Sequence, residues 1–486
     1  MTPDRRTVLI GSGALLAGAA ALTLERGWWR APHTTRLQEM RTGGDGVTLL
    51  AHEHPLTLGH ESGPTPAWIY GDAPFPVLRI VRGDMFSATL VNGLRYQHTS
   101  IHWHGVRVPN AMDGVAYVTQ KPVQPGEKFT YRFAPRDTGT YFFHPHCNTS
   151  EQVGRGLAGV LIVEGDETEP YDDDVVCVLK DWRLSADGSF LPFVTPAGAA
   201  RAGSFGTLRT VNGRQSPKIA VPAGADLRLR LVNADSTRIA ELGIDGAEAA
   251  IIAIDGHAIT PFPLETWRLG PAMRLDLALR TPLEGKHVRL IDYFAPEPVT
   301  LATLTPHGAQ KRTNDFVPQA LMPASLPEPD LATAENHQLA LGATATVPNY
   351  PNPPDIVLAD GTRIDVVDSL CLNANTFWSI DGQSWPRQGH QFLPPPLLDF
   401  KRGQSVAIEF FNTTPHAHPM HLHGHAFKVL SADQFKRPVH WADTVLVMPD
   451  ERVKIAFVAD NPGNWMIHCH IIEHQDTGMM AWFRVS

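Results

Sequence analysis

Short segments that alternate between hydrophobic and polar residues run through the chain from about residue 47 onward. They are rich in Val, Ile, Thr, Phe and Tyr, and Gly, Pro, Asn or Asp interrupts them at intervals of roughly eight to twelve residues. Alternation with a period of two places successive side chains on opposite faces of an extended strand. Clear examples are 128–133, 158–164, 226–232 and 405–411. Sustained helical periodicity is scarce, so the pattern predicts an all-β protein built from β-sandwiches.

Two breaks in composition indicate domain boundaries. The first is an acidic stretch from Glu164 to Asp174, and the second is a proline-rich stretch from Asn314 to Pro329. Such stretches are typical of linkers between domains. The chain after its N-terminal segment is therefore predicted to form three sandwich domains in tandem. Their predicted bounds are 40–166, 170–320 and 335–486.

A weak internal repeat indicates that two of the domains are related. Residues 82–84 and 401–404 each contain Arg-Gly followed by a polar residue, and each precedes an alternating strand. The strand ends in both cases at an asparagine, Asn92 or Asn412, that opens a loop. A histidine-rich motif follows each loop, so the first and last thirds are expected to share a structural unit.

The N-terminal segment has the features of an export signal. Arg5 and Arg6 precede an apolar stretch of small residues from Val8 to Leu24. This order is typical of a signal of the twin-arginine type, predicted over residues 1–30, with cleavage expected near 19–21. A membrane anchor is the alternative, although the stretch is short for a span. The sequence thus predicts a periplasmic or secreted protein with no membrane partner beyond the export machinery.

The charge balance argues against a nucleic-acid partner. The 486 residues include 41 Lys and Arg against 50 Asp and Glu, a formal net charge of -9, with no basic run beyond the extreme N-terminus. A small organic molecule or a metal ion is the better substrate class. Histidine is abundant, with 23 residues, and many of them fall in His-x-His clusters. Such clustering is typical of metal binding.

Four histidine clusters lie in the first and last thirds of the chain. Residues two apart in a strand face the same side, so each His-x-His pair can present two imidazoles to one space. If the terminal domains pack together, eight imidazoles can surround one polynuclear metal centre between them. The clusters are 102–105, 144–146, 418–423 and 468–479.

Cys469 stands between two histidines, so alternation sends its sulfur to one face and the two imidazoles to the other. One residue thereby joins two metal sites. Together with His418, His474 and the thioether of Met479, it completes the ligand set of a blue-copper centre. Thiolate and thioether ligands beside imidazole favour copper over zinc.

The other three cysteines are Cys147, Cys177 and Cys371. In an exported protein an odd set allows at most one disulfide, together with a free thiol. The sequence leaves the choice of pair open.

These motifs resemble those of the multicopper oxidase family of laccases, bilirubin and ascorbate oxidases and bacterial cuproxidases, over essentially the whole chain after the signal. The resemblance implies three cupredoxin-like Greek-key β-sandwich domains and four copper ions, one of type 1, one of type 2 and two of type 3. The type 1 ligands would be His418, Cys469, His474 and Met479. The type 2 ligands would be His102 and His421. The type 3 ligands would be His104, His144, His146, His423, His468 and His470.

Two acids close to the ligands, Asp113 and Glu473, match positions that deliver protons to the trinuclear centre in similar bacterial enzymes. Reduction of dioxygen consumes protons, so a relay is required. For each of the two, a solvated loop acid is the alternative.

Four further residues near the clusters are assigned other roles. Asp443 resembles an acid near the type 1 histidine, where substrate docks. His416 and His425 are off the ligand pattern and are expected to support the ligands or to lie at the surface. Trp378 is expected to be an ordinary core anchor.

The resemblance implies an oxidoreductase with dioxygen as electron acceptor. Substrate would reduce type 1 copper one electron at a time, the His468-Cys469-His470 bridge would carry electrons inward, and four of them would convert dioxygen to water. A laccase-like oxidase of phenols or aromatic amines is favoured, and a metallo-oxidase of Cu(I), Fe(II) or Mn(II) is the alternative. No methionine occurs between Met322 and Met420, so the methionine-rich lid of some relatives that oxidise cuprous ion is missing.

Two other classes of function are weighed against the oxidase. A non-catalytic cupredoxin-fold protein for export or interaction is disfavoured by the complete set of ligands. Copper storage or chaperoning is disfavoured by the His-Cys-His bridge, which storage does not need. The sequence leaves the oligomeric state open.

Overall fold

The computed structural model describes residues 36–43, 46–59, 63–343, 356–357, 363–364, 378–386 and 393–486. The predicted signal segment 1–30 and Cys371 lie outside these residues. Residues 36–486 belong to one compact unit. None of the helices in the described part of the chain has the length and apolar character needed to cross a membrane.

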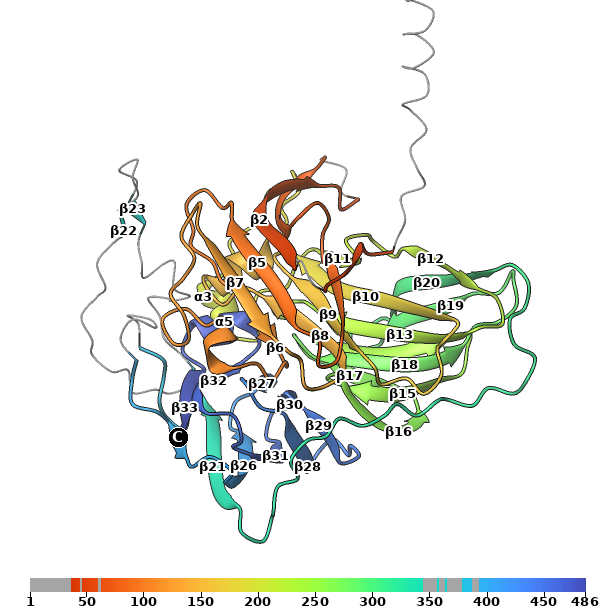
Figure 1. The fold of residues 1–486 in the computed structure, drawn as a ribbon. Coiled ribbons are helices and arrows are strands. Elements are labelled where there is room, and N and C mark those ends of the chain that lie inside the picture. The colour runs from red at the N-terminus through yellow and green to blue at the C-terminus, as the bar shows by residue number, and fades with distance from the viewer. Residues whose placement is uncertain are drawn as a thin grey trace, which may run out of the picture. The chain divides into compact units, whose positions relative to one another are not determined.

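Three pairs of β-sheets follow one another along the sequence (Figure 1). The first pair joins the sheet β1 (Glu39–Arg41), β4 (Val77–Val81), β9 (Gly159–Glu164), β8 (Gly139–His144), β6 (His102–His104) to the sheet β3 (Thr65–Tyr70), β2 (Val47–Leu56), β5 (Phe86–Asn92), β7 (Lys128–Phe133).

The second pair joins the sheet β11 (Leu208–Val211), β10 (Asp173–Trp182), β13 (Asp226–Asn233), β18 (Arg274–Arg280), β15 (Ala249–Ile254), β16 (His257–Pro263) to the sheet β12 (Lys218–Pro222), β20 (Val299–His307), β19 (Val288–Asp292), β14 (Ala240–Asp245), β17 (Trp267–Leu269).

The third pair joins the sheet β24 (Ser379–Ile380), β21 (Glu335–Gly342), β26 (Ser405–Asn412), β31 (Arg452–Val458), β28 (Phe427–Ala432), β29 (His440–Ala442) to the sheet β25 (Leu398–Phe400), β33 (Met480–Val485), β32 (Gly463–Cys469), β27 (His418–Leu422), β30 (Thr444–Val447). A separate two-stranded ribbon contains β22 (Ile356–Val357) and β23 (Arg363–Ile364).

The three pairs share one pattern of strand pairing. In one sheet of each pair, a middle strand runs parallel to one neighbour and antiparallel to the other. These trios, with the middle strand second, are β2-β5-β7, β10-β13-β18 and β21-β26-β31. The other sheets contain the corresponding trios β4-β9-β8, β12-β20-β19 and β25-β33-β32. The predicted class, an all-β protein of three tandem cupredoxin-like Greek-key sandwiches, is confirmed. The bounds 40–166, 170–320 and 335–486 stay a prediction.

A buried asparagine ends the equivalent strand in all three sandwiches. Asn92, Asn233 and Asn412 are the last residues of β5, β13 and β26, and all are fully buried. Each donates from Nδ2 to two backbone carbonyls and accepts at Oδ1 the amide two residues further on. The predicted repeat between the first and last thirds therefore extends to the middle third, because an asparagine side chain holds the backbone of the same loop in all three.

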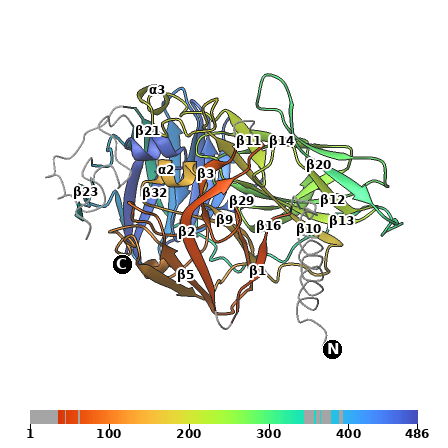
Figure 2. The same ribbon diagram turned by 90° about the horizontal axis from the view of Figure 1, so that it is seen from above.

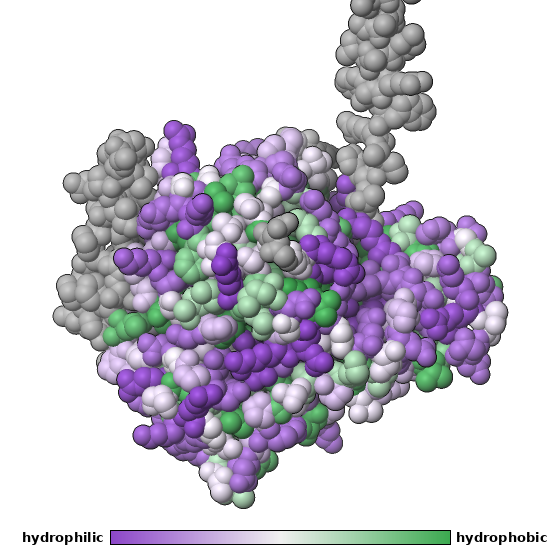
Figure 3. All heavy atoms as spheres, viewed as in Figure 1, coloured by the Kyte–Doolittle hydropathy of each residue, from purple (hydrophilic) through white to green (hydrophobic). Residues whose placement is uncertain are grey.

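Each sandwich encloses its own apolar core, and the first and second also share one. Residues of β9 and β8, such as Val160 and Phe142, pack with Trp182 and Val232 of the second sandwich. On the face shown in Figure 3, hydrophilic residues prevail and hydrophobic ones are dispersed among them. Burial of apolar side chains in these cores supplies the main favourable free energy of folding.

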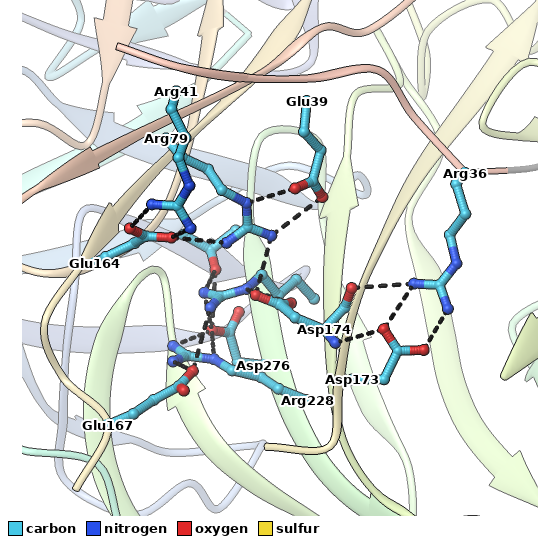
Figure 4. A network of polar contacts seen from close by, with 12 residues as sticks. Arg36, Glu39, Arg41, Arg79, Glu164, Glu167, Asp173, Asp174, Arg228 and Asp276 are labelled. Atoms are coloured by element: carbon cyan, nitrogen blue, oxygen red, sulfur yellow. Dashed lines mark hydrogen bonds and ion pairs between the residues drawn. The ribbon is translucent and has the colours of Figure 1, made fainter. Parts of the chain in front are cut away.

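A network of ion pairs around the buried Arg79 and Arg228 also joins the first and second sandwiches (Figure 4). The Arg228 side chain, fully buried on β13, donates to Asp166 at 2.8 and 2.9 Å and to Asp276 at 2.7 Å. Arg79 on β4 donates to Glu39 at 2.8 Å and to Asp174 at 3.1 Å. Removing one partner of a buried pair costs about 3–5 kcal/mol. The network therefore opposes any other arrangement of these two sandwiches.

Two short helices mark where the first and third sandwiches meet. Helix α2 (Thr149–Gly154) follows β8, helix α5 (Ile472–Asp476) follows β32, and the two pack against each other. Helix α3 (Pro196–Ala199) of the second sandwich also contacts α5. All three sandwiches thus contribute residues around the end of β32.

Candidate metal centres

The histidines of the first sandwich lie on two paired strands. Strands β6 and β8 run antiparallel, and His102 stands directly opposite His144. Opposite residues share one face of a sheet, so both imidazoles point the same way. Trp103 points to the other face, where its ring lies 4.9 Å from Phe86 and 5.2 Å from Phe143. The alternation within His-Trp-His thus gives one face to the core and the other to the site.

The histidines of the third sandwich follow the same rule. In the antiparallel pair β27 and β32, His421 stands opposite His468 and Met420 stands opposite Cys469. Met420 and Cys469 belong to the apolar core of the third sandwich. His421 and His468 point away from that core, so the opposite orientations predicted for the sulfur and the imidazoles are present.

The two sets of histidines meet in facing pairs of ring nitrogens. The Nε2 atoms of His102 and His421 lie 3.4 Å apart, and those of His144 and His470 lie 3.3 Å apart. Both pairs join the first sandwich to the third. A further pair within the third sandwich separates the Nε2 atoms of His423 and His468 by 3.0 Å. The eight predicted ligands of the polynuclear centre are all buried.

These pairs fit metal ions better than they fit hydrogen bonds. The ring nitrogen remote from the pair is held by a backbone carbonyl in His102, His144 and His421, at 2.8, 3.0 and 2.8 Å. A carbonyl only accepts, so Nδ1 carries the proton and Nε2 presents a lone pair. In the pair of His102 and His421 both facing nitrogens therefore carry lone pairs, which repel, but a cation that binds each nitrogen at about 2.0 Å satisfies both.

His104 is oriented the other way round. Its Nε2 lies 3.0 Å from both Asp443 Oδ1 and Thr444 Oγ1, whereas its Nδ1 has no hydrogen-bond partner within the described ranges. Asp443 is itself held by Arg274 of the second sandwich, whose Nη1 donates to Oδ1 at 2.9 Å. Nδ1 is therefore the nitrogen of His104 that is available to a metal.

The expectation that Asp443 lies near the type 1 histidine where substrate docks is wrong. The residue is fully buried and contacts His104 and Arg274. The reason lies in the strand register, because the neighbouring Thr444 pairs with His421 and the turn from β29 to β30 directs the carboxylate inward.

The second centre is a triangle around Cys469. Its Sγ lies 3.6 Å from His418 Nδ1 and 3.7 Å from His474 Nδ1, and these two nitrogens are 3.1 Å apart. The amide of Ile471 donates to the sulfur at 3.3 Å. Met479 is buried in the same core, and its carbonyl accepts the amide of Cys469 at 3.0 Å. Burial raises the pKa of the Cys469 thiol, so a bound cation is needed to displace its proton.

Trp378 and Thr414 support this triangle, and the sequence analysis assigned neither of them to it. The ring of Trp378 lies 4.2 Å from that of His474 and 5.1 Å from that of His418. Thr414 Oγ1 lies 2.8 Å from His418 Nε2. Trp378 belongs to the apolar core of the third sandwich, as predicted, and within that core it packs on His418 and His474. Only the strand order brings it there, so no local motif could have identified it.

The two predicted proton-delivering acids differ in position. Asp113 Oδ2 accepts His423 Nδ1 at 2.8 Å, which places the acid against the polynuclear centre. Glu473 instead accepts the amide of Thr195 and the hydroxyl of Ser204, both at 2.9 Å. Among the described contacts none joins Glu473 to a histidine of that centre. Its role in proton delivery stays a prediction, and its contacts hold the loop 195–204 beside α5.

The remaining candidates lie off the ligand groups. His425 is buried and its Nδ1 donates to the carbonyl of His423 at 3.2 Å, and the His416 ring lies 6.0 Å from that of Trp378. Both therefore stand beside ligands without joining them. Cys147 and Cys177 are separate buried thiols. Cys371, the third cysteine of the predicted odd set, lies outside the described residues.

Comparison with known proteins identifies one family along the chain. Family models described as multicopper oxidase match residues 57–168, 173–287 and 371–486. A solved multi-copper oxidase from Pseudomonas thermotolerans is 36% identical, with a TM-score of 0.79, and the match covers 93% of this chain and all of that one. An iron transport multicopper oxidase of Candida glabrata is 25% identical, covering 84% of this chain and 71% of the relative. Laccase-2 of Botryotinia fuckeliana is 26% identical, covering 85% and 77%.

Loss of the Asp113 carboxylate should weaken the polynuclear centre alone. Asp113→Ala removes the acceptor that holds His423, and loss of such support costs about 10–100-fold in metal affinity or activity. We expect fewer bound copper ions and a lower kcat, with the absorption of the cysteine-containing site unchanged. Asp113→Asn keeps an acceptor oxygen, so it should retain copper while kcat still falls if the acid carries protons. Normal copper content and kcat in Asp113→Ala would contradict the assignment.

The copper-free protein should lose stability in mild acid. Burial, followed by the neighbouring imidazoles, lowers the pKa of His104, His421 and His423 well below the ordinary value, and burial lowers that of His474 to about 3. Below the unfolded pKa of about 6.5, the unfolded chain binds more protons, and each such group removes up to about 1.4 kcal/mol per pH unit. The Tm of copper-free protein should therefore fall between about pH 7 and pH 5. A copper-free Tm that is constant over this range would show that these imidazoles are already hydrated.

Proposed function

The chain belongs to the multicopper oxidase family, and on that basis we propose that it couples four one-electron oxidations of an organic substrate to the reduction of dioxygen to water. The observation that carries the proposal is the position of Cys469, whose sulfur faces His418 and His474 while the adjoining residues belong to the facing imidazole pairs. A cupredoxin fold used for interaction alone does not require such a bridge.

The proposal assigns the ligands as the family resemblance does. Copper held by His418, Cys469, His474 and Met479 would accept single electrons, and three further ions held by the eight buried histidines would supply four-electron chemistry to dioxygen. The peptide of Cys469 connects the two centres through covalent bonds. The apolar core around Cys469 excludes water from the sulfur, and Asp113 and Asp443 fix the imidazoles that they contact.

We place substrate at the edge of His474. Its Nε2 donates to the carbonyl of Arg201 at 2.6 Å, so the loop 195–204 forms the outer wall of this centre. That loop contains no carboxylate and no thioether, and its one charge is the exposed Arg201. The exposed Arg201 repels a cuprous, ferrous or manganous ion and tolerates a phenol, whereas the carboxylate of Glu473 behind the loop is buried. This charge supports a laccase-like substrate, a phenol or aromatic amine, over a metal ion.

Export to the periplasm or beyond through a twin-arginine signal also belongs to the proposal. It rests on the sequence of residues 1–30. Folding before export would allow the buried sites to be completed in one compartment.

Replacement of the bridging sulfur should remove colour and activity together. Cys469→Ser should eliminate the intense blue absorption, reduce the copper content from about four ions to about three by the ligand count, and abolish oxygen consumption. Cys177→Ala is the matched control, since this cysteine is equally buried, in the core of the second sandwich. It should keep the colour. Turnover that survives in Cys469→Ser would refute the proposed electron path.

Substrate class can be resolved by oxygen consumption with a panel of phenols, aromatic amines, Cu(I), Fe(II) and Mn(II). We expect the organic reductants to give the highest kcat/KM. Arg201→Glu should raise kcat/KM for Fe(II) severalfold relative to that for a neutral phenol, because it reverses the charge at the wall. Arg214→Glu, in the same sandwich but outside the loop, is the control. A wild-type preference for a metal ion would favour a metallo-oxidase.

A further inference from the structure

A cavity of about 430 Å³ opens between the second and third sandwiches, and the proposed electron path does not use it. Its walls come from the segment 262–268 around β17 and from the segment 435–448 that contains β29 and β30. The volume lies within the range of about 300–1,000 Å³ that is typical of small-molecule sites. None of the proposed copper ligands lines it.

Aromatic rings form much of the wall. Phe262 and Trp267 lie with ring centroids 6.1 Å apart, and Trp267 stands edge-on to His440 at 6.1 Å. Across the cavity, Phe435 is covered by the guanidinium of Arg268 at 3.8 Å. Rings arranged in this way offer both faces and edges to a flat aromatic ligand.

One hydrogen-bonding group at the cavity is incompletely used. Arg437 has five N–H groups, and within the described chain only Nη2 donates, to the Leu446 carbonyl at 2.8 Å and more weakly to Glu451. The unmet demand is for acceptor oxygens.

The charges at this wall balance, so the capacity for an anion comes from unused N–H groups. Arg268 is paired with Glu241 at 3.0 Å, and Arg437 lies 3.3 Å from the buried Glu451. That pair involves only Nη2 of Arg437, so its other N–H groups can bind a carboxylate.

The inner end of the cavity reaches a residue that contacts metal ligands. Thr444 lines the cavity, and its hydroxyl lies 3.0 Å from His104 Nε2 and 3.2 Å from His421 Nδ1. A molecule bound in the cavity would thus be separated from the polynuclear centre by the side chain of Thr444.

We infer that this cavity is a binding site for a planar aromatic carboxylate, with the ring among Phe262, Trp267 and Phe435 and the carboxylate toward Arg437. The site is separate from the substrate edge at His474. The inference goes beyond the proposed oxidase function, since it requires binding and no electron transfer.

Benzoate is the probe, because it is aromatic, anionic and resistant to one-electron oxidation by such centres. Calorimetric titration of copper-loaded protein should give one molecule bound per chain, with weaker binding of benzamide and of cyclohexanecarboxylate. Arg437→Lys keeps the positive charge beside Glu451 but removes the guanidinium, so it should weaken benzoate binding about tenfold or more. Met448→Trp fills the cavity and should abolish binding. Arg155→Lys, at a similarly half-buried arginine in the first sandwich, should leave binding unchanged.

Copper content and the blue absorption of every variant report whether it has folded. Absence of benzoate binding to the wild type, or equal binding in Met448→Trp, overturns the site. Equal binding of cyclohexanecarboxylate overturns the aromatic class of ligand. Oxygen consumption is measured separately with the reductant panel. A protein that binds benzoate but consumes no oxygen would contradict only the proposed function.

Discussion

The opposition of neutral imidazole nitrogens across the boundary between the first and third sandwiches is the constraint on which the architecture depends. His102 faces His421 and His144 faces His470 at 3.3–3.4 Å, with the protons of His102, His144 and His421 held on the remote nitrogens by carbonyls. Such lone pairs repel unless a cation lies between them. Packing of the two sandwiches and binding of metal are therefore a single coupled equilibrium, in which each supplies what the other lacks.

The second sandwich contributes no proposed metal ligand, yet it fixes the geometry of the centres. Arg274 reaches from β18 to Asp443, which orients His104, and Asp255 accepts the amides of Arg274 and Thr444. The loop 195–204 covers His474 from the same sandwich. The pairs of Arg228 with Asp166 and of Arg79 with Asp174 hold this sandwich to the first (Figure 4). Figure 2 shows β12, β13 and β20 of the second sandwich to the right of β2 and β5 of the first.

The sequence was sufficient for whatever follows from local alternation. Period-two patterns predicted the sandwiches, and the same alternation predicted that Cys469 and its neighbouring histidines point to opposite faces. It was insufficient where the decisive contact joins strands far apart in the chain. Asp443 was assigned to the wrong centre, because its partner Arg274 lies 169 positions away. Trp378 was correctly assigned to a core, but its contact with His474, 96 positions away, could not be predicted. The third asparagine, Asn233, lacked a histidine motif after it and so escaped notice.

The two centres differ in their surroundings, as the proposed separation of electron transfer from oxygen reduction requires. The Cys469 triangle is embedded in the apolar core of one sandwich, where rigid packing keeps the ligands in place during changes of oxidation state. The polynuclear centre instead lies between sandwiches, where a buried acid such as Asp113 contacts its imidazoles. Under the proposed function, the first site only transfers electrons and gains from enclosure, whereas the second must also receive dioxygen and protons. The peptide of Cys469 and strand β27, which carries both His418 and His421, connect the two environments.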